Sequence, residues 1–251
     1  MIQSLDRGLQ ALDILAKYEA LGVTELAQLL EVDKSTASRI VETLKQHDMV
    51  QQIRNTRKYK LGFRVLHLGE GLRKSLNVID IARPILREVC RELEQSVHLC
   101  AYNNSMVYVI DQVVSNQQYT MLAMVGMIEP VHSSSVGKCI LSYRREDIRD
   151  AILDDYDFKQ YTPKTITNKE DLLIELEKIK EQGYAVDDEE MVLGVRCIAA
   201  PVFDYRNSVR YSIGISGPTT VMTPEKIVFY KKKLISAANK IGREMGYRIK
   251  G

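Results

Sequence analysis

Three short amphipathic patterns fill the first 47 residues of the chain. Apolar side chains recur every three or four positions in residues 4–19, which predicts a helix with one buried face and with Ser4 as its N-cap. A second, shorter helix is expected directly after Thr24, which is its predicted N-cap. Asp33 is then a natural N-cap for a third helix over residues 34–47. Two short helices joined by a tight polar turn are typical of a helix-turn-helix.

The third helix has two unlike faces, and a hairpin follows it. Its apolar side chains share one face, whereas the opposite side carries short polar and cationic residues. The apolar set is Ala37, Ile40, Val41 and Leu44. From residue 49 to 61 the period changes, and a polar stretch punctuated by single apolar residues predicts a hairpin with Asn55 and Thr56 at its tip. We therefore expect residues 1–62 to form a winged helix-turn-helix domain.

The next stretch predicts a helix that links two domains. Residues 63–77 carry an apolar stripe with three- and four-residue steps, formed by Val65, Leu68, Leu72 and Leu76. Gly69 and Gly71 each cost such a helix about 1 kcal/mol relative to alanine. A helix that carries an apolar stripe although two glycines weaken it is expected to pack that stripe against another protein surface. We predict an interdomain linker helix over residues 63–77 that also contacts a second subunit.

The remainder of the chain, residues 78–251, alternates between strand-like and helical patterns. Strands are predicted at residues 97–102, 106–113, 119–125, 184–187, 197–203 and 209–216. Helices are predicted at residues 81–93, 137–143, 146–153 and 168–182, the last with a capping box of Thr167 and Glu170, and a final helix begins at Pro224 behind Thr223. Hairpins mixed with separated helices indicate an α+β domain with a largely antiparallel sheet.

Composition and cysteine spacing agree with two ordinary globular domains. A chain of 251 residues that is 45% hydrophobic and 27% charged suits two domains with a core each. No stretch approaches 18 consecutive apolar residues and no signal-peptide pattern is present, so we expect a cytoplasmic protein without a membrane span. The four cysteines show no CxxC spacing and are expected to be reduced, buried thiols. A metal site shared by His132, Cys139 and Cys197 is the less favoured alternative, and no cofactor is predicted.

Positive charge is concentrated in the second half of the predicted helix-turn-helix. The whole chain carries only +2. Residues 1–32, however, hold two cationic against five acidic residues, whereas residues 33–60 hold seven against three, a local net charge of +4. Such a cationic patch suits the phosphate backbone of double-stranded DNA. The alternative, a winged helix that binds protein, leaves this charge unexplained.

Eight residues are the predicted DNA contacts. Short polar side chains near the start of the third helix let its backbone enter the major groove. Arg39 is the leading base-reading residue, since a bidentate arginine–guanine contact discriminates by roughly 1–3 kcal/mol. The remaining cations are expected at phosphates or in the minor groove. The full set is Lys34, Ser35, Thr36, Ser38, Arg39, Arg54, Arg57 and Lys58.

Three short polar clusters mark the C-terminal part of the chain, HSSSVGK at 132–138, GYAVDDEE at 183–190 and SIGISGP at 212–218. The first contains Gly-Lys, but a P-loop requires glycine where His132 stands and serine or threonine where Cys139 stands. The segment still places a run of hydroxyls and backbone N–H groups at the start of a helix, where a small anion can bind. None of the three clusters alone specifies an activity.

Taken together and in this order, these segments resemble the IclR-type transcriptional regulators of bacteria and archaea. The matching segments are SLDRGLQALDIL at 4–15, the helix-turn-helix with its wing, VHSSSVGKCIL at 131–141, GYAVDDEE followed by GVRCIAAPVFD, and SIGISGP. The resemblance covers essentially the whole chain. It implies an N-terminal winged helix-turn-helix, a linker helix and a C-terminal GAF-like effector-binding domain, with homodimers or dimers of dimers on palindromic operators.

The resemblance also implies where a small-molecule effector binds. The family pocket is formed by the loop before Gly-Lys, the first acidic residue of the DDEE run and the polar residues of the last motif. In this chain these positions are Ser135, Val136, Asp187, Gly214 and Ser216. Gly214 stands where the family often has a serine, and Ser135 with Val136 replaces a smaller pair. The apolar side of the pocket is expected to come from Met121, Met124 and Met127.

We therefore expect a ligand-responsive transcription factor. Its C-terminal domain is predicted to bind a small metabolite, in the simplest case a small organic acid, and thereby to alter DNA binding. The competing hypothesis is an enzyme in which Cys197 or His132 is the reactive group. The sequence contains no nucleophile–base–orienter set with a recognisable spacing, so no catalytic residue is predicted.

Overall fold

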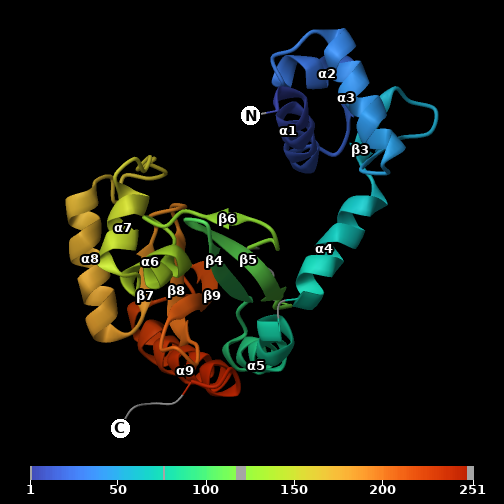
Figure 1. The fold of residues 1–251 in the computed structure, drawn as a ribbon. Coiled ribbons are helices and arrows are strands. Elements are labelled where there is room, and N and C mark those ends of the chain that lie inside the picture. The colour runs from blue at the N-terminus through green and yellow to red at the C-terminus, as the bar shows by residue number, and fades with distance from the viewer. Residues whose placement is uncertain (1, 76, 117–122, 248–251) are drawn as a thin grey trace. The chain divides into compact units, whose positions relative to one another are not determined.

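The structure is a computed structural model that describes residues 2–75, 77–116 and 123–247 (Figure 1). The chain divides into two compact units, residues 1–75 and residues 76–251. Each unit has hydrophobic core residues of its own. Among the helices of the described residues, none is long and apolar enough to cross a membrane.

The N-terminal unit is a helix-turn-helix followed by a hairpin. Its elements are α1 (Gln3–Lys17), β1 (Leu21–Gly22), α2 (Val23–Leu29), α3 (Lys34–Gln46), β2 (Val50–Gln52), β3 (Lys58–Leu61) and α4 (Phe63–Ser75). The three strands form one antiparallel sheet in the order β1-β3-β2, and Asn55 takes a left-handed conformation (φ 61°) between β2 and β3. The predicted hairpin is confirmed. The shared core of helices and sheet contains Leu15, Leu26, Val41 and Val50.

The predicted helix caps are right for α3 and wrong for α1 and α2. Asp33 caps α3 through its side chain. α1 begins directly after Ile2, so Ser4 lies inside the helix. α2 begins directly after Gly22, so Thr24 also lies inside the first turn. Gly22 belongs to β1, a two-residue strand that is too short for an alternating pattern to reveal it.

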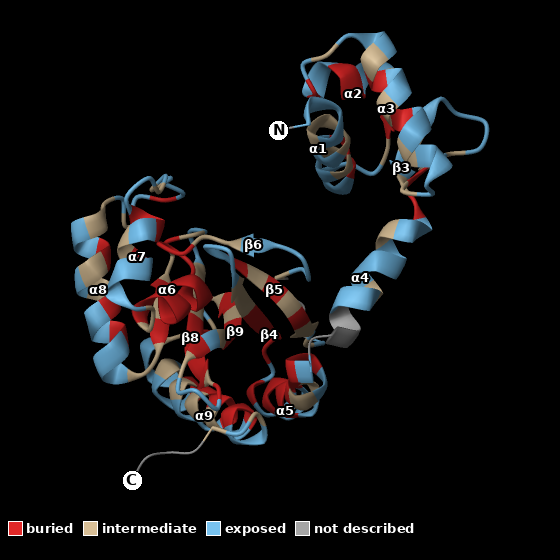
Figure 2. Cartoon of the chain, in the orientation of Figure 1, coloured by how far each residue is buried: buried red, intermediate tan, exposed pale blue. Residues whose placement is uncertain are grey.

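Gly62 forms the junction between the hairpin and α4. Its N–H donates to the Met49 carbonyl at 2.8 Å, and a Cβ atom here would lie 2.0 Å from the Asp48 carbonyl oxygen. The close approach of the two backbones therefore requires a residue without a side chain. Beyond this junction, the first turns of α4 present the apolar side chains of Phe63 and Leu66 to solvent (Figure 2).

The C-terminal unit is built on a six-stranded antiparallel sheet. Its strands are β4 (Val97–Asn103), β5 (Met106–Val113), β6 (Ile128–Glu129), β7 (Ala185–Asp188), β8 (Val195–Phe203) and β9 (Val209–Pro218), in the order β6-β5-β4-β9-β8-β7. Its helices are α5 (Asn77–Leu93), α6 (Ser135–Ser142), α7 (Glu146–Leu153), α8 (Lys169–Gln182) and α9 (Pro224–Glu244). The predicted α+β class with a largely antiparallel sheet is confirmed.

Helices cover both faces of this sheet (Figure 1). α5 and α9 pack against the face that carries Leu99 and Ile198. α6, α7 and α8 pack against the face that carries Cys100 and Ala199. Neighbouring residues in a strand point to opposite faces, so the same strands contribute to both cores. The central strands are accordingly buried (Figure 2).

Most predicted elements of this unit are present, with ends shifted by a few residues. The exception is the strand expected at 119–125: its described residues, 123–125, are not in a strand, and the others lie outside the described part of the chain. The sequence does not predict β6, because two residues are too few to show alternation. The cap of α8 also differs from the expected capping box with Thr167. Asn168 is the cap, and its Oδ1 atom accepts a hydrogen bond from the Asp171 N–H at 2.8 Å.

Candidate functional site

α3 buries one face and exposes the other. Ala37 and Val41 are buried, whereas Lys34, Ser38 and Arg39 are exposed. The buried face fixes the helix against α1 and α2. The exposed N-terminal half combines a guanidinium fork with a short hydroxyl side chain. A helix that enters a major groove needs this combination of a rigid inner face and short polar outer residues.

The first hydroxyls of α3 are tied to its N-cap. The Asp33 carboxylate accepts hydrogen bonds from Ser35 Oγ at 2.5 Å, from Thr36 Oγ1 at 2.7 Å and from the Thr36 N–H at 2.9 Å. These bonds, that from the Ser35 hydroxyl first, hold the pKa of Asp33 well below its usual range. Since their protons are engaged, Ser35 and Thr36 can only accept further hydrogen bonds through their hydroxyls.

The cations around the turn of the hairpin are exposed. They are Arg54, Arg57 and Lys58. Neither they nor Lys34 and Arg39 form an ion pair with any carboxylate of the described residues. Cations without an internal partner are available to bind an external anion, such as the phosphates of a nucleic acid.

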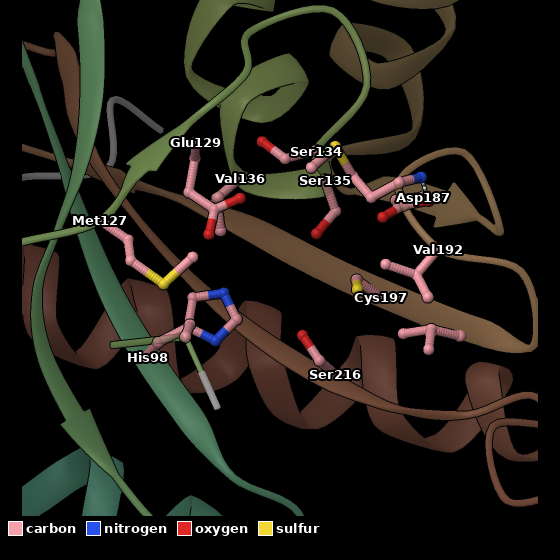
Figure 3. A pocket seen from close by; sticks show the side chains of 13 residues that line it. His98, Met127, Glu129, Ser134, Ser135, Val136, Asp187, Val192, Cys197 and Ser216 are labelled. Carbon is pink, nitrogen blue, oxygen red and sulfur yellow. Dashed lines mark hydrogen bonds between the residues drawn. The ribbon is translucent and has the colours of Figure 1, made fainter. Parts of the chain in front are cut away.

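The C-terminal unit contains a cavity of about 130 Å³ between the sheet and the start of α6 (Figure 3). The cavity is lined by His98, Ala123, Met127, Glu129, Ser134, Ser135, Val136, Asp187, Met191, Val192, Val195, Cys197 and Ser216. Its polar groups are two carboxyls, one imidazole, one thiol and three hydroxyls. A space of this volume suits about six non-hydrogen atoms, since a cavity of about 150 Å³ accommodates benzene.

Strand register places three lining residues in one row across the sheet. Asp187 in β7 pairs with Cys197 in β8, and Cys197 pairs in turn with Ser216 in β9. The next row contains His98 in β4 and its partner Gly214 in β9. The Cβ atoms of cross-strand partners lie about 5 Å apart, so the register brings together residues that are far apart in the sequence.

Asp187 is buried and is held by backbone donors. Its Oδ1 atom accepts hydrogen bonds from the N–H groups of Glu190 at 2.7 Å and Met191 at 3.3 Å. Burial raises the pKa of Asp187 in spite of these bonds. Burial, and then the Asp187 charge, raise the pKa of Cys197 well above its usual range. The Cys197 thiol is therefore protonated and a poor nucleophile.

Glu129 and His98 face the cavity from the side opposite to Asp187 (Figure 3). Burial, and then the Asp187 charge, raise the pKa of Glu129. Burial lowers the pKa of His98 to about 4, so its imidazole is neutral near pH 7. The described lining of the cavity thus carries a carboxyl on each side and neither a lysine nor an arginine.

The first turn of α6 borders the same cavity. Ser134 caps the helix, and its Oγ atom accepts a hydrogen bond from the Gly137 N–H at 3.0 Å. The N–H groups of the next residues, Ser135 and Val136, have no acceptor within the helix because they belong to its first turn. The start of a helix with such N–H groups favours an anion.

Lys138 is turned into the protein rather than toward the cavity. Its ammonium group is completely buried and forms an ion pair with Glu190, which removes it from any phosphate-binding role. Burial raises the pKa of Glu190 to about 7, although the Lys138 charge acts in the opposite direction. The Oε2 atom of Glu190 is buried and has no hydrogen-bond partner among the described residues.

Comparison with known proteins identifies the family. A sequence model described as "Bacterial transcriptional regulator IclR C-terminal" matches residues 71–243, and one described as "IclR helix-turn-helix domain" matches residues 4–54. The chain belongs to the IclR family. It is accordingly a transcriptional regulator with a helix-turn-helix DNA-binding domain and a C-terminal effector domain.

Relatives in the IclR family span nearly the whole chain. The HTH-type transcriptional regulator KdgR of Escherichia coli is 34% identical over 94% of this chain and 90% of its own length. The transcriptional repressor IclR of the same organism is 31% identical over 96% of this chain and 89% of its own length. The crystal structure of an IclR transcriptional regulator from Alicyclobacillus acidocaldarius matches with a TM-score of 0.84 at 28% identity, over 97% of this chain and 98% of the other. These relatives are named as regulators, not as enzymes.

Four of the five effector contacts implied by the IclR resemblance line the cavity, namely Ser135, Val136, Asp187 and Ser216. Gly214 lies beside the cavity but does not line it. A Cβ atom at this position would lie 2.7 Å from His98 Nε2 and 2.8 Å from Val136 Cγ1. The imidazole of His98 thus takes the space that a serine at position 214 would need.

The apolar side of the cavity differs in part from the expectation. Met127 lines it, Met124 is not among its lining residues, and Met121 lies outside the described residues. Sequence reasoning missed His98 and Glu129. The signal for His98 is its pairing with Gly214, which cannot be read without the β4–β9 register, and Glu129 lies in the short β6.

His132 is hydrogen-bonded to other parts of the protein through both ring nitrogens. Its Nδ1 atom is hydrogen-bonded to the Tyr156 hydroxyl and its Nε2 atom to the Lys159 carbonyl, both at 3.0 Å. Tyr156 and Phe158 also pack edge-on against its ring. In the part of the chain that the structure describes, no group of three His, Cys, Asp or Glu side chains could hold a metal ion.

Proposed function

We propose that α3 is the recognition helix of this regulator and that the β2–β3 hairpin is its wing on DNA. The proposal is carried by the exposed cations of α3 and the hairpin, which lack internal ion pairs among the described residues. Arg39 reads a base edge in the major groove. The side chains at the start of the helix are short, so that its backbone can approach the bases; they are Ser35, Thr36 and Ser38. The phosphate or minor-groove contacts are Lys34, Arg54, Arg57 and Lys58.

The proposed division of the chain assigns DNA binding to residues 1–62, the linker helix to residues 63–77 and effector binding to residues 78–251. The functional unit is a homodimer or a dimer of dimers on a palindromic operator, because one recognition helix reads only a few base pairs. Exposed apolar side chains on α1 and α4 support a contact between subunits. The protein acts in the cytoplasm, where its operator lies.

The proposed effector is a small organic acid. Its carboxylate binds at the N–H groups of Ser135 and Val136, where the start of α6 favours negative charge. Ser216 and Asp187 complete the polar wall from the sheet. The occupant changes DNA binding only to the extent that it prefers one of two arrangements of the regulator.

Arg39 variants test the DNA-binding proposal. In the full-length protein, Arg39→Ala is expected to weaken binding to the protein's own upstream region by about 10- to 100-fold, corresponding to ~1–3 kcal/mol for a bidentate base contact. Its effect on unrelated DNA is expected to be smaller. Arg39→Lys keeps the charge but loses the planar fork, so sequence preference is expected to fall while non-specific binding persists. Fluorescence anisotropy with labelled fragments measures both.

Two further variants make the comparison specific. Arg57→Ala is expected to weaken binding to both DNAs alike and to lower the salt dependence by about one phosphate contact. Lys17→Ala is the matched control, because this exposed cation of α1 has no assigned role on DNA. Unaltered operator affinity of Arg39→Ala would contradict the base-reading role.

A further inference from the structure

Glu129 is a carboxyl group that faces the cavity without a cation. Among the described residues it forms no ion pair, and its one neighbouring side-chain donor is the Ser134 hydroxyl, which lowers its pKa but also donates to the Pro130 carbonyl at 2.8 Å. A carboxyl group that is largely removed from water is costly unless hydrogen-bond donors or a cation compensate it. The side chain points into the cavity (Figure 3), so a bound molecule can supply that donor.

His98 presents a second uncompensated polar group to the same space. Its side chain is only 5% exposed, and neither ring nitrogen is hydrogen-bonded to a described residue. The ring is fixed because it fills the gap above Gly214, where a Cβ atom would lie 2.7 Å from Nε2. A neutral imidazole has one N–H donor and one acceptor nitrogen. Buried polar groups are normally paired, and here the cavity is the open side.

We propose that Glu129 and His98 form a subsite for a hydroxyl group, so that the effector is a small hydroxy acid rather than a plain carboxylic acid. The inference rests on the proposed binding of the effector's carboxylate at the start of α6. Figure 3 shows Glu129 and His98 together on one side of the cavity, with Ser135 between them and Asp187. One occupant can therefore reach both the helix start and this subsite.

A hydroxyl group satisfies both residues, whereas the alternatives do not. It donates its proton to Glu129 and accepts a hydrogen bond from the N–H of His98. An ammonium group has three donors and no acceptor, so it can pair with Glu129 but not with a His98 N–H that faces the cavity. A plain acid offers neither residue a partner. The cavity volume of about 130 Å³ accommodates about six non-hydrogen atoms, which matches a three-carbon acid with one hydroxyl.

Isothermal titration of the full-length protein with four three-carbon probes tests this subsite. The probes are propionate, lactate, 3-hydroxypropionate and alanine, all at one pH and ionic strength. At least one of the two hydroxy acids is expected to bind about tenfold or more tightly than propionate, equivalent to ~1.4 kcal/mol. Alanine, which has the size of lactate but an ammonium group, is expected to bind no better than propionate.

Variants of the two residues locate the effect. Glu129→Leu and His98→Leu are each expected to abolish the preference for the hydroxy acid, so that its affinity and that of propionate become equal in each variant. Glu129→Gln keeps an acceptor oxygen and is expected to retain part of the preference. The melting temperature of each variant shows whether it folds. If a leucine variant does not fold, the preference of the wild-type protein among the four probes still decides the proposal.

The outcomes separate the subsite from the proposed function. Equal binding of the hydroxy acids and propionate would overturn the hydroxyl subsite and leave the carboxylate site in place. Tighter binding of alanine than of both hydroxy acids would also overturn it, because the donor would then be an ammonium group. Failure of all four probes to bind would overturn the carboxylate site and the subsite together. Operator binding by the unliganded protein, measured separately, tests the DNA-binding proposal.

Discussion

Gly214 and His98 are two residues that share one space in the sheet. They are direct cross-strand partners in β9 and β4, and the imidazole occupies the space that a side chain at 214 would need. The family resemblance implies a serine hydroxyl at position 214, and in this chain the imidazole of His98 takes that space. A difference that looks like a loss of polarity in the sequence is an exchange of one polar group for another.

Substitution of Gly214 tests this coupling. Gly214→Ala is expected to destabilise the C-terminal unit by about 1–3 kcal/mol, because the added methyl group overpacks against His98 and Val136. Gly8→Ala is the control, since no atom lies within 4 Å of a Cβ at this position in α1. It is expected to be neutral or stabilising by up to about 1 kcal/mol. Urea unfolding followed by circular dichroism measures both, and a Gly214→Ala variant as stable as wild type would contradict the predicted overpacking.

At the scale of elements, one ion pair joins α6 to the loop after β7. Lys138 of the helix is buried against Glu190 of the loop. The same loop provides the two N–H groups that hold the Asp187 carboxylate. The pair therefore connects the two elements that border the cavity from the helix side and from the sheet edge.

Removing one partner of this pair is expected to be more damaging than removing both. Lys138→Met leaves the Glu190 carboxyl buried without its cation and is expected to lower the free energy of unfolding by about 3–5 kcal/mol. The double variant Lys138→Met/Glu190→Met is expected to recover most of that loss, because no buried charge remains. Urea unfolding well above pH 7 measures this, because the pKa of Glu190 is about 7 beside Lys138 and rises further when that charge is removed. Equal destabilisation in the single and double variants would show that packing, not charge, dominates.

The elements that the sequence predicts are those with enough residues to show a period. The amphipathic face of α3, its Asp33 cap and the long strands of the C-terminal sheet follow from local patterns. β1 and β6 have two residues each, and no local pattern identifies them. The cavity was only partly predictable for a related reason. His98 and Glu129 reach it through strand pairing, and pairing is a property of the whole sheet.

At the scale of the whole molecule, α1 has more apolar surface than its own unit covers. Ala11 and Leu15 are buried in the core, but Ile2, Leu5 and Leu9 are 69%, 59% and 55% exposed on a second stripe. A helix on the surface of a monomeric protein needs only one apolar face. A second apolar stripe, together with the exposed apolar side chains of α4, is typical of a surface that meets another subunit.

In the proposed homodimer or dimer of dimers, charges placed on that stripe are expected to separate the subunits. Leu5→Glu/Leu9→Glu is expected to halve the mass of the assembly or to reduce it to monomers, as measured by size-exclusion chromatography with light scattering. The affinity for a palindromic operator is expected to fall more than the affinity for a half-site. Ile174→Glu, which places the same charge on an exposed apolar position of α8, is the control and is expected to leave the mass unchanged. An unchanged mass of the α1 variant would place the contact elsewhere.

The row of side chains formed by Asp187, Cys197 and Ser216 has a consequence for how such a regulator can diverge. The positions are fixed by backbone hydrogen bonds between β7, β8 and β9, which do not depend on the side chains that the row carries. Substitutions in the row can therefore change the chemistry of the cavity wall while the strands stay in register. The sheet fixes the positions, and mutation and selection determine which side chain stands at each.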